Sequence, residues 1–186
     1  MSNREKIEKV IIYIVFALFI LLMIKILFLS RVSFFELFDG EREVERSFNL
    51  IPFQSVIEFL LGNTENSRNF SYANLVGNIA IFIPLGFYIS FFRKESRKDN
   101  ILVKSILTVF VVSLAVEIVQ WLFVIGTADI DDIILNCIGG FVGILVFKML
   151  IHIIKNERIV HTIIAIVSII GLPVIYYYLF IIIMRF

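Results

Sequence analysis

The chain has 186 residues, of which 60% are hydrophobic and 15% aromatic, and its mean hydropathy is +0.97. A water-soluble domain of this size could not bury so much apolar surface, so the composition indicates an integral membrane protein. The formal net charge of +1 gives no sign of a nucleic-acid partner, and the single Cys137 excludes an intrachain disulfide.

Five apolar stretches are each long enough to cross a hydrocarbon core of about 30 Å as a helix. They run over Ile7–Leu29, Ala73–Phe92, Ile101–Ile125, Ile133–Ile154 and Ile159–Met184. The first stretch is too long for a typical signal-peptide core, so we expect it to remain as a transmembrane helix. The pattern predicts an all-α, polytopic membrane bundle in which residues 1–186 form a single membrane domain.

Basic residues mark alternate connections between these stretches. They are Arg4, Lys6 and Lys9 before the first stretch, Arg93, Lys94, Arg97 and Lys98 after the second, and Lys155 and Arg158 after the fourth. The connection over residues 126–132 has no Lys or Arg and carries three aspartates. Because Lys and Arg retain loops in the cytoplasm, we predict a cell-membrane protein with a cytoplasmic amino terminus and an external carboxyl terminus.

The connection over residues 30–72 is the long external one in this topology. Within it, Val56, Ile57, Phe59, Leu60 and Leu61 recur at a spacing typical of a helix, but the run is too short to span. We therefore expect an interfacial or re-entrant helix in this segment.

Polar residues inside the second, third and fourth stretches gather toward the predicted outer side. Glu117 and Gln120 share one helical face, and Asn74 and Asn78 share another. At 1.5 Å per residue, Glu117 lies about 12 Å below the outer end of its stretch, and Gln120, Asn78 and Asn136 about 6–8 Å. With Asp129, Asp131 and Asp132 at the mouth, the pattern predicts an outward-facing polar vestibule.

Glu117 is the residue for which a functional role is most favoured. A carboxylate at that depth must be protonated, hydrated or paired, because an isolated charge in lipid costs at least a few kcal/mol. Its candidate partners are a bound ion, a ligand, or one of the basic residues Lys25, Arg31, Arg42, Arg46, Arg68 and Arg185.

Structural roles compete for the other positions. Asp131 and Asp132 precede an apolar stretch, where an aspartate can cap a helix, and the three asparagines can hydrogen-bond between helices. Ala73/Gly77 and Gly139/Gly143, with Gly140 beside them, have the spacing of close helix packing, and Pro84 is expected to kink its helix. His152 and His161 have no metal-ligand spacing and are interpreted as incidental, so no metal or cofactor is expected.

Four ordered blocks resemble the VanZ-like membrane protein family. They are Asn49–Phe53 (NLIPF), Asn74–Gly86, Glu117–Gln120 (EIVQ) and Asp129–Gly140, and the similarity covers about residues 46–148. The resemblance implies the motif positions Asn49, Pro52, Asn78, Pro84, Gly86, Glu117, Gln120, Asp129, Asp131, Asp132, Asn136 and Gly140. Family members often have an arginine near Thr127, which this chain lacks.

The resemblance implies an association with resistance to teicoplanin and related glycopeptides, as an accessory factor without a settled reaction. Three mechanisms stay open: a non-enzymatic protein that binds a lipid-linked or cell-wall component, an ion- or proton-coupled transporter or flippase, and an intramembrane enzyme using Glu117. We favour the first, with membrane lipids, a lipid-linked cell-wall precursor or a glycopeptide as partners. Transport by five spans would require a homo-oligomer. The predicted ligand-binding residues are Glu117, Gln120, Asn78, Asn136, Asp129, Asp131, Asp132 and Asn49.

Overall fold

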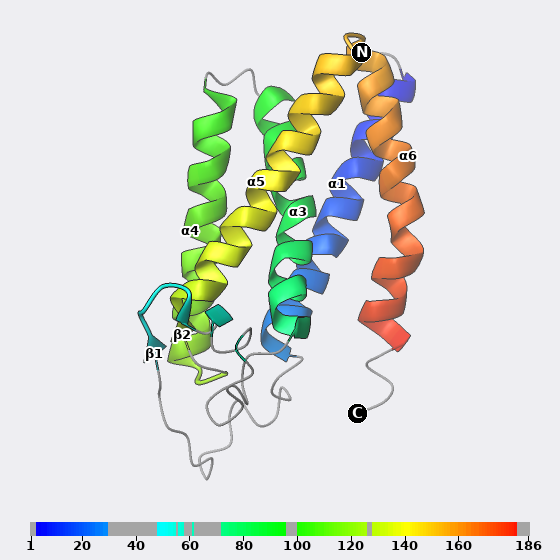
Figure 1. The fold of residues 1–186 in the computed structure, drawn as a ribbon. Helices are drawn as coiled ribbons and strands as arrows, with labels where there is room; N and C mark the ends of the chain where they lie inside the picture. Colours follow the sequence, from blue (N-terminus) through cyan, green and yellow to red (C-terminus); the bar gives the residue numbers. More distant parts are fainter. Residues whose placement is uncertain are drawn as a thin grey trace. The chain divides into compact units, whose positions relative to one another are not determined.

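The computed structural model describes residues 3–29, 48–54, 56–57, 61, 72–95, 100–125 and 128–181. Its helices are α1 (Asn3–Ile24), α3 (Tyr72–Glu95), α4 (Ile101–Leu122), α5 (Ile130–Ile153) and α6 (Glu157–Tyr176), and α1 and α6 continue as the π-helical turns η1 (Lys25–Leu29) and η4 (Tyr177–Ile181). Two short strands, β1 (Phe48–Asn49) and β2 (Ala128–Asp129), complete the described elements (Figure 1).

Among the described residues, five helices are long and apolar enough to cross a membrane. They correspond to the five apolar stretches, so the predicted all-α polytopic bundle is confirmed. The strands β1 and β2 were not predicted, because a two-residue strand has too few positions to produce an alternating pattern. They pair in parallel, with Phe48 opposite Ala128 and Asn49 opposite Asp129.

The chain forms two compact units, divided within α5 between Phe147 and Lys148. The first comprises residues 1–30 and 148–186 and contains α1 and α6; the second comprises residues 31–147 and contains α3, α4 and most of α5. We call them the α1–α6 unit and the α3–α5 unit, and each is described separately.

In the α1–α6 unit the two long helices run parallel, and both begin at the same end (Figure 1). Near their starts, Arg158 Nε donates to Glu5 Oε1 at 3.2 Å. Near their ends, Lys25 Nζ donates to the carbonyl oxygens of Tyr178 and Leu179. The difference in residue number between the bonded partners is nearly the same at both ends of the pair. A constant difference is what two parallel helices packed side by side produce.

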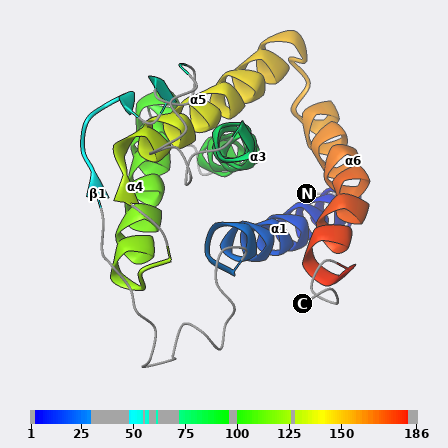
Figure 2. The same ribbon diagram turned by 60° about the horizontal axis from the view of Figure 1, so that its bottom comes forward.

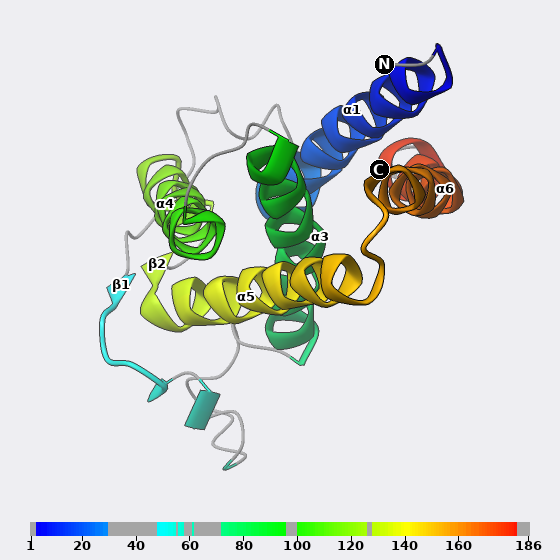
Figure 3. The ribbon, with the colours of Figure 1, turned by 90° about the horizontal axis from the view of Figure 1, so that it is seen from above.

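Three glycines on α5 bring it against the backbone of α3. A Cβ added at Gly139 or Gly143 would lie less than 3.0 Å from the backbone of Ile79 or Ile83, respectively. A Cβ at Gly86 would meet the backbone of Gly140 just as closely. Without a hydrophobic force between helices in lipid, such close approach supplies the van der Waals contact that holds them together. Figure 3 shows α5 crossing α3.

The other predicted packing glycine differs. A Cβ at Gly77 would meet no described atom within 4 Å, and the residue is exposed. Small-xxx-small spacing therefore marks a close contact at Gly139 and Gly143, whereas Gly77 makes none with the described residues. Pro84 lies inside α3, which is helical on both sides of it.

The predicted interfacial helix in the long connection is described only in part. Gln54, Val56 and Ile57 are helical, and the amide of Ile57 donates to the carbonyl of Phe53 at 2.9 Å. The amide of Leu61 donates in turn to the carbonyl of Ile57 at 2.9 Å. Of the segment over residues 30–72, the structure describes only residues 48–54, 56–57, 61 and 72.

Candidate functional site

Polar side chains gather at the end of the α3–α5 unit where α4 ends and α5 begins, which we call the acidic end. Figure 3 shows β2 at the start of α5 with β1 beside it, and Figure 2 shows β1 beside α4. Buried here are Asn78, Glu117, Gln120, Asp129, Asp131, Asp132 and Asn136. The structure thus brings seven of the eight predicted ligand-binding residues to one end of one unit, and Asn49 reaches the same end on β1.

The helices α4 and α5 pair antiparallel, which sets the levels of these side chains. A Cβ at Gly140 would meet the side chain of Val109, and one turn toward the acidic end Asn136 Nδ2 donates to Ser113 Oγ at 3.1 Å. Four residues along each helix correspond to about 6 Å. One further turn brings Glu117 and Asp132 to the same level, close to the acidic end.

Asp129 holds the junction between α4 and α5. Its Oδ1 accepts the amide of Asp131 at 2.9 Å, which caps the start of α5, and its own amide donates to Glu117 Oε2 at 3.2 Å. Asn49 Nδ2 reaches the same Oδ1 at 3.5 Å. The capping residue of α5 is therefore Asp129, one helical position before Ile130, and Asp131 and Asp132 lie inside the first turn rather than before it.

Asp131 binds the backbone of the segment that carries Asn49. Its Oδ1 accepts the amide of Phe53, and its Oδ2 accepts the amide of Val56 at 3.2 Å. Because these are the first free amides of the helical turn at residues 53–57, the carboxylate caps that turn from a distant part of the chain. Asp131 is only 1% exposed whereas Phe53 is exposed, so the contact is part-buried.

Asn49 stabilises the same segment from within. Its Oδ1 accepts the amide of Ile51 at 3.1 Å, a local turn that directs the chain toward Pro52 and Phe53. Phe53 has φ 64°, in the left-handed region where a side chain is disfavoured. Together the β1–β2 pairing, Asn49 and Asp131 attach residues 48–57 to the start of α5.

Asp132 connects α5 to α3. Its Oδ1 accepts Asn78 Nδ2 at 2.6 Å, and both residues are buried. Asn78 and Asn136 thus make the interhelical hydrogen bonds predicted for them, to α5 and α4 respectively. Asn74, also in the first turns of α3, is half-buried.

Ser113 is the site residue that the sequence analysis missed. It lies one turn from Glu117, so Ser113, Glu117 and Gln120 share one buried face of α4. Serine hydrogen-bonds its own helix so readily that its presence in a span carries little signal. The signal that could have identified it is this regular spacing below Glu117.

Glu117 and Gln120 lie closer to the end of their helix than predicted, whereas Asn78 and Asn136 lie slightly deeper in theirs. Helix α4 ends at Leu122, not at Ile125, so Glu117 lies about 7 Å from the helix end and Gln120 about 3 Å. Asn78 and Asn136 lie about 9 Å inside α3 and α5, because those helices begin at Tyr72 and Ile130. The helix ends early because Val124 adopts φ 52°.

Of the basic residues considered as partners for Glu117, only Lys25 is described, and its Nζ binds backbone carbonyls of η4. Arg31, Arg42, Arg46, Arg68 and Arg185 lie outside the described residues. Within the described part of the chain, no group of three His, Cys, Asp or Glu residues could hold a metal ion.

Residues 15–153 match the protein family described as VanZ/LLP1. The chain belongs to this family. A relative named Protein VanZ, from Enterococcus faecium, is 33% identical over 105 residues, which cover 56% of this chain and 55% of the relative. The chain thus spans about half the length of that relative. No solved structure matches the chain.

Membership of the VanZ/LLP1 family confirms the resemblance found in the sequence, and with the five apolar helices it indicates a multi-pass membrane protein. The matched range contains α3, α4, α5, both strands and all the buried polar residues of the acidic end. The contacts of Asn49, Asn78, Asp129, Asp131 and Asp132 therefore belong to the part of the chain that carries the family likeness.

Proposed function

We propose that this chain is a non-enzymatic membrane protein that binds a lipid-linked or cell-wall component at the acidic end and thereby lowers susceptibility to teicoplanin-type glycopeptides. The family assignment and the relative named Protein VanZ support the link to resistance. In the proposed topology the acidic end faces outward, where glycopeptides act.

The observation that carries the binding role is how the carboxylates are engaged. Asp131 accepts two backbone amides, Asp129 caps α5, and Glu117 accepts the amide of Asp129. Carboxylates with these partners fix the shape of a surface made by residues 48–57 and the first turn of α5. Such a preorganised, acceptor-rich surface suits recognition of the N–H and O–H groups of a lipid-linked or cell-wall component.

The packing below the acidic end favours binding over transport. One turn below Asn136, Gly140 lies against Gly86 on α3 and Val109 on α4. Phe82 and Leu85 are buried on α3 at this depth. A translocated headgroup would have to separate backbones that are in van der Waals contact. The polar residues of the acidic end therefore lie above a tightly packed layer, which favours binding at that end over passage through the unit.

The test compares teicoplanin susceptibility in a sensitive host that expresses the wild-type chain, Glu117→Gln, Asp132→Asn or no protein. The proposal expects wild type to protect and both variants to lose protection at equal membrane abundance. A matched control, Glu95→Gln at the last residue of α3, should keep protection because it lies at the opposite end of that helix from Asn78. Unchanged protection by both site variants would rule the proposal out.

A biochemical arm separates the mechanisms. Mass spectrometry of lipids that co-purify with wild type and are lost from Glu117→Gln would identify the bound component. Turnover of a lipid-linked precursor that Glu117→Gln abolishes would instead establish an enzyme. Ion- or proton-dependent lipid translocation in liposomes would establish a transporter.

A further inference from the structure

A second candidate site lies in the α1–α6 unit, at the end where both helices begin. It is a pocket of about 510 Å³ lined by Glu5 and Lys9 of α1 and by Asn156, Glu157, Arg158 and His161 of the α6 start. This volume is within the range of about 300–1,000 Å³ typical of small-molecule sites. None of the lining residues belongs to the acidic end described above.

Two contacts give the pocket a defined frame. The ion pair between Arg158 and Glu5 joins α6 to α1 at 3.2 Å. Asn156 Oδ1 accepts the amides of Arg158 at 3.0 Å and Ile159 at 3.4 Å, which caps α6 and fixes where the helix begins. The positions of the lining side chains therefore follow from the packing of the helix pair.

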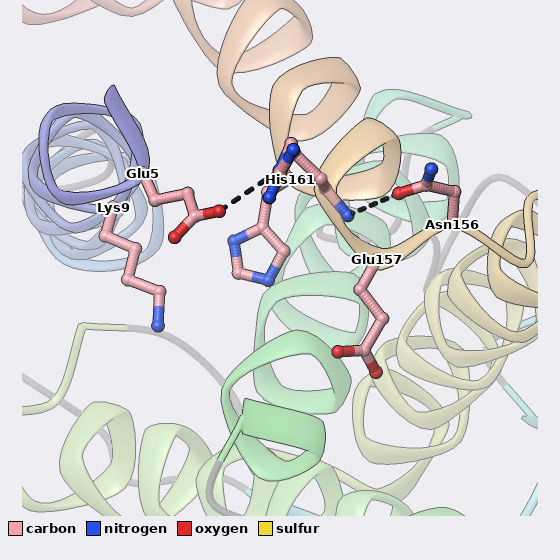
Figure 4. A pocket seen from close by; sticks show the side chains of 6 residues that line it. Glu5, Lys9, Asn156, Glu157 and His161 are labelled. Carbon is pink, nitrogen blue, oxygen red and sulfur yellow. Dashed lines mark hydrogen bonds and ion pairs between the residues drawn. The ribbon is translucent and has the colours of Figure 1, made fainter. Parts of the chain in front are cut away.

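The remaining lining side chains present both signs of charge. Figure 4 shows Lys9, His161 and Glu157 extending to the same side, with the imidazole between the ammonium and the carboxylate. The starts of α1 and α6 add the positive ends of two parallel helix dipoles. One side of the pocket thus favours an anion, and Glu157 offers an acceptor for a cation.

The position of the pocket in the sequence places it at a membrane surface. Its residues belong to the first two turns of the spans Asn3–Phe28 and Glu157–Phe180, except Asn156, which directly precedes the second span. Phospholipid headgroups occupy this level of a bilayer. A lipid whose headgroup carries a phosphate and an ammonium group, with its acyl chains beside α1 and α6, would place each of these charges next to an opposite charge in the pocket.

We propose that this pocket binds the headgroup of a zwitterionic phospholipid with a primary ammonium, of the phosphoethanolamine type. The phosphodiester is bound by Lys9 and His161, and the ammonium donates to Glu157. An anionic headgroup without an amine is disfavoured because it offers no positive group to pair with Glu157. A quaternary ammonium headgroup is disfavoured because it has no N–H to donate to that carboxylate. His161, which the sequence analysis interpreted as incidental, is in this proposal a phosphate-binding residue.

The experiment is native mass spectrometry of the full-length protein in detergent. The protein is offered equal amounts of phosphatidylethanolamine, phosphatidylglycerol and phosphatidylcholine with the same acyl chains. The proposal expects phosphatidylethanolamine adducts to dominate, and the Lys9→Gln/His161→Gln double variant to weaken them about tenfold, as expected for loss of charge-assisted hydrogen bonds. Lys9→Arg, which keeps the charge, should retain most of the binding.

Glu157→Gln provides the specificity test. It should remove the preference for phosphatidylethanolamine while phosphatidylglycerol still binds. Lys155→Gln and His152→Gln are matched controls, because they make the same changes nearby in residues that do not line the pocket. Equal binding of all three lipids by wild type, or unchanged binding by the double variant, would overturn the proposal. Complete displacement of lipid by equimolar inorganic phosphate would overturn the assignment to a lipid.

Discussion

Replacing Gly143 with alanine is the sharpest test of how the α3–α5 unit is held together. A Cβ at this position would lie 2.8 Å from the amide nitrogen of Phe87, and the carbonyl of Ile83 would be closer still. Ordinary contact begins at 3.4 Å, so the nitrogen contact alone requires a shift of 0.6 Å, and the closer carbonyl of Ile83 requires the helices to separate by more than that. Both neighbours are backbone, which cannot rotate away as a side chain can.

Overpacking of this kind costs about 1–3 kcal/mol, and we expect the upper part of that range here. The control is Gly77→Ala on α3, where a Cβ would meet no described atom within 4 Å. Alanine favours a helix over glycine by up to about 1 kcal/mol at either position, so the difference between the two variants isolates the clash.

The assay is unfolding in mixed micelles of increasing SDS, followed by the fluorescence of the single Trp121 at the end of α4. Gly143→Ala should unfold at lower SDS than wild type, whereas Gly77→Ala should match or exceed it. If the two alanine variants are equally stable, the close approach of α5 and α3 is not what holds this unit together.

Three further predictions address single contacts. Asp131→Asn should accelerate hydrogen exchange at the amides of Phe53 and Val56 about 10- to 100-fold, because a hydrogen bond to a charged group contributes about 1.5–3 kcal/mol. Unchanged exchange at these amides would contradict the capping role of Asp131. A double-mutant cycle of Asn136→Ala and Ser113→Ala should give a coupling near the 0.6 kcal/mol average for such pairs in membranes, and strictly additive effects would contradict their hydrogen bond. Lys25→Met should increase hydrogen exchange in η4 while Lys25→Arg preserves protection, and equal protection in both would show that the lysine does not hold those carbonyls.

The five spans could be predicted because lipid imposes one requirement on every residue of a helix. Each span needs a long apolar run, and the polar ends are marked by residues such as Arg93 and Asn156. The gathering of Glu117, Asp132 and Asn136 at one end followed from depth alone, because alternating spans bring the same side of each helix together.

The partners of those residues could not be predicted from the sequence. Asp131 binds two main-chain amides, those of Phe53 and Val56, and a main-chain amide has no residue type that would reveal it. The hydrogen bond from the amide of Asp129 to Glu117 could not be predicted either, because its donor is also a main-chain group. Gly77 and Gly143 have equal sequence signals but different surroundings, because only one of them lies where α3 and α5 cross.

These contacts determine how functional data on the acidic residues must be interpreted. Asp131 holds residues 48–57 against α5, so its loss would disturb a binding surface even if the carboxylate never touches a ligand. Glu117 supports the same surface by accepting the amide of Asp129, at the level of Asp132. A variant set that pairs Glu117→Gln with Asp131→Asn, and measures hydrogen exchange of residues 48–57 in both, separates the two roles. Loss of protection against teicoplanin with unchanged exchange in Glu117→Gln would assign ligand contact to Glu117, since the surface around it would still be intact.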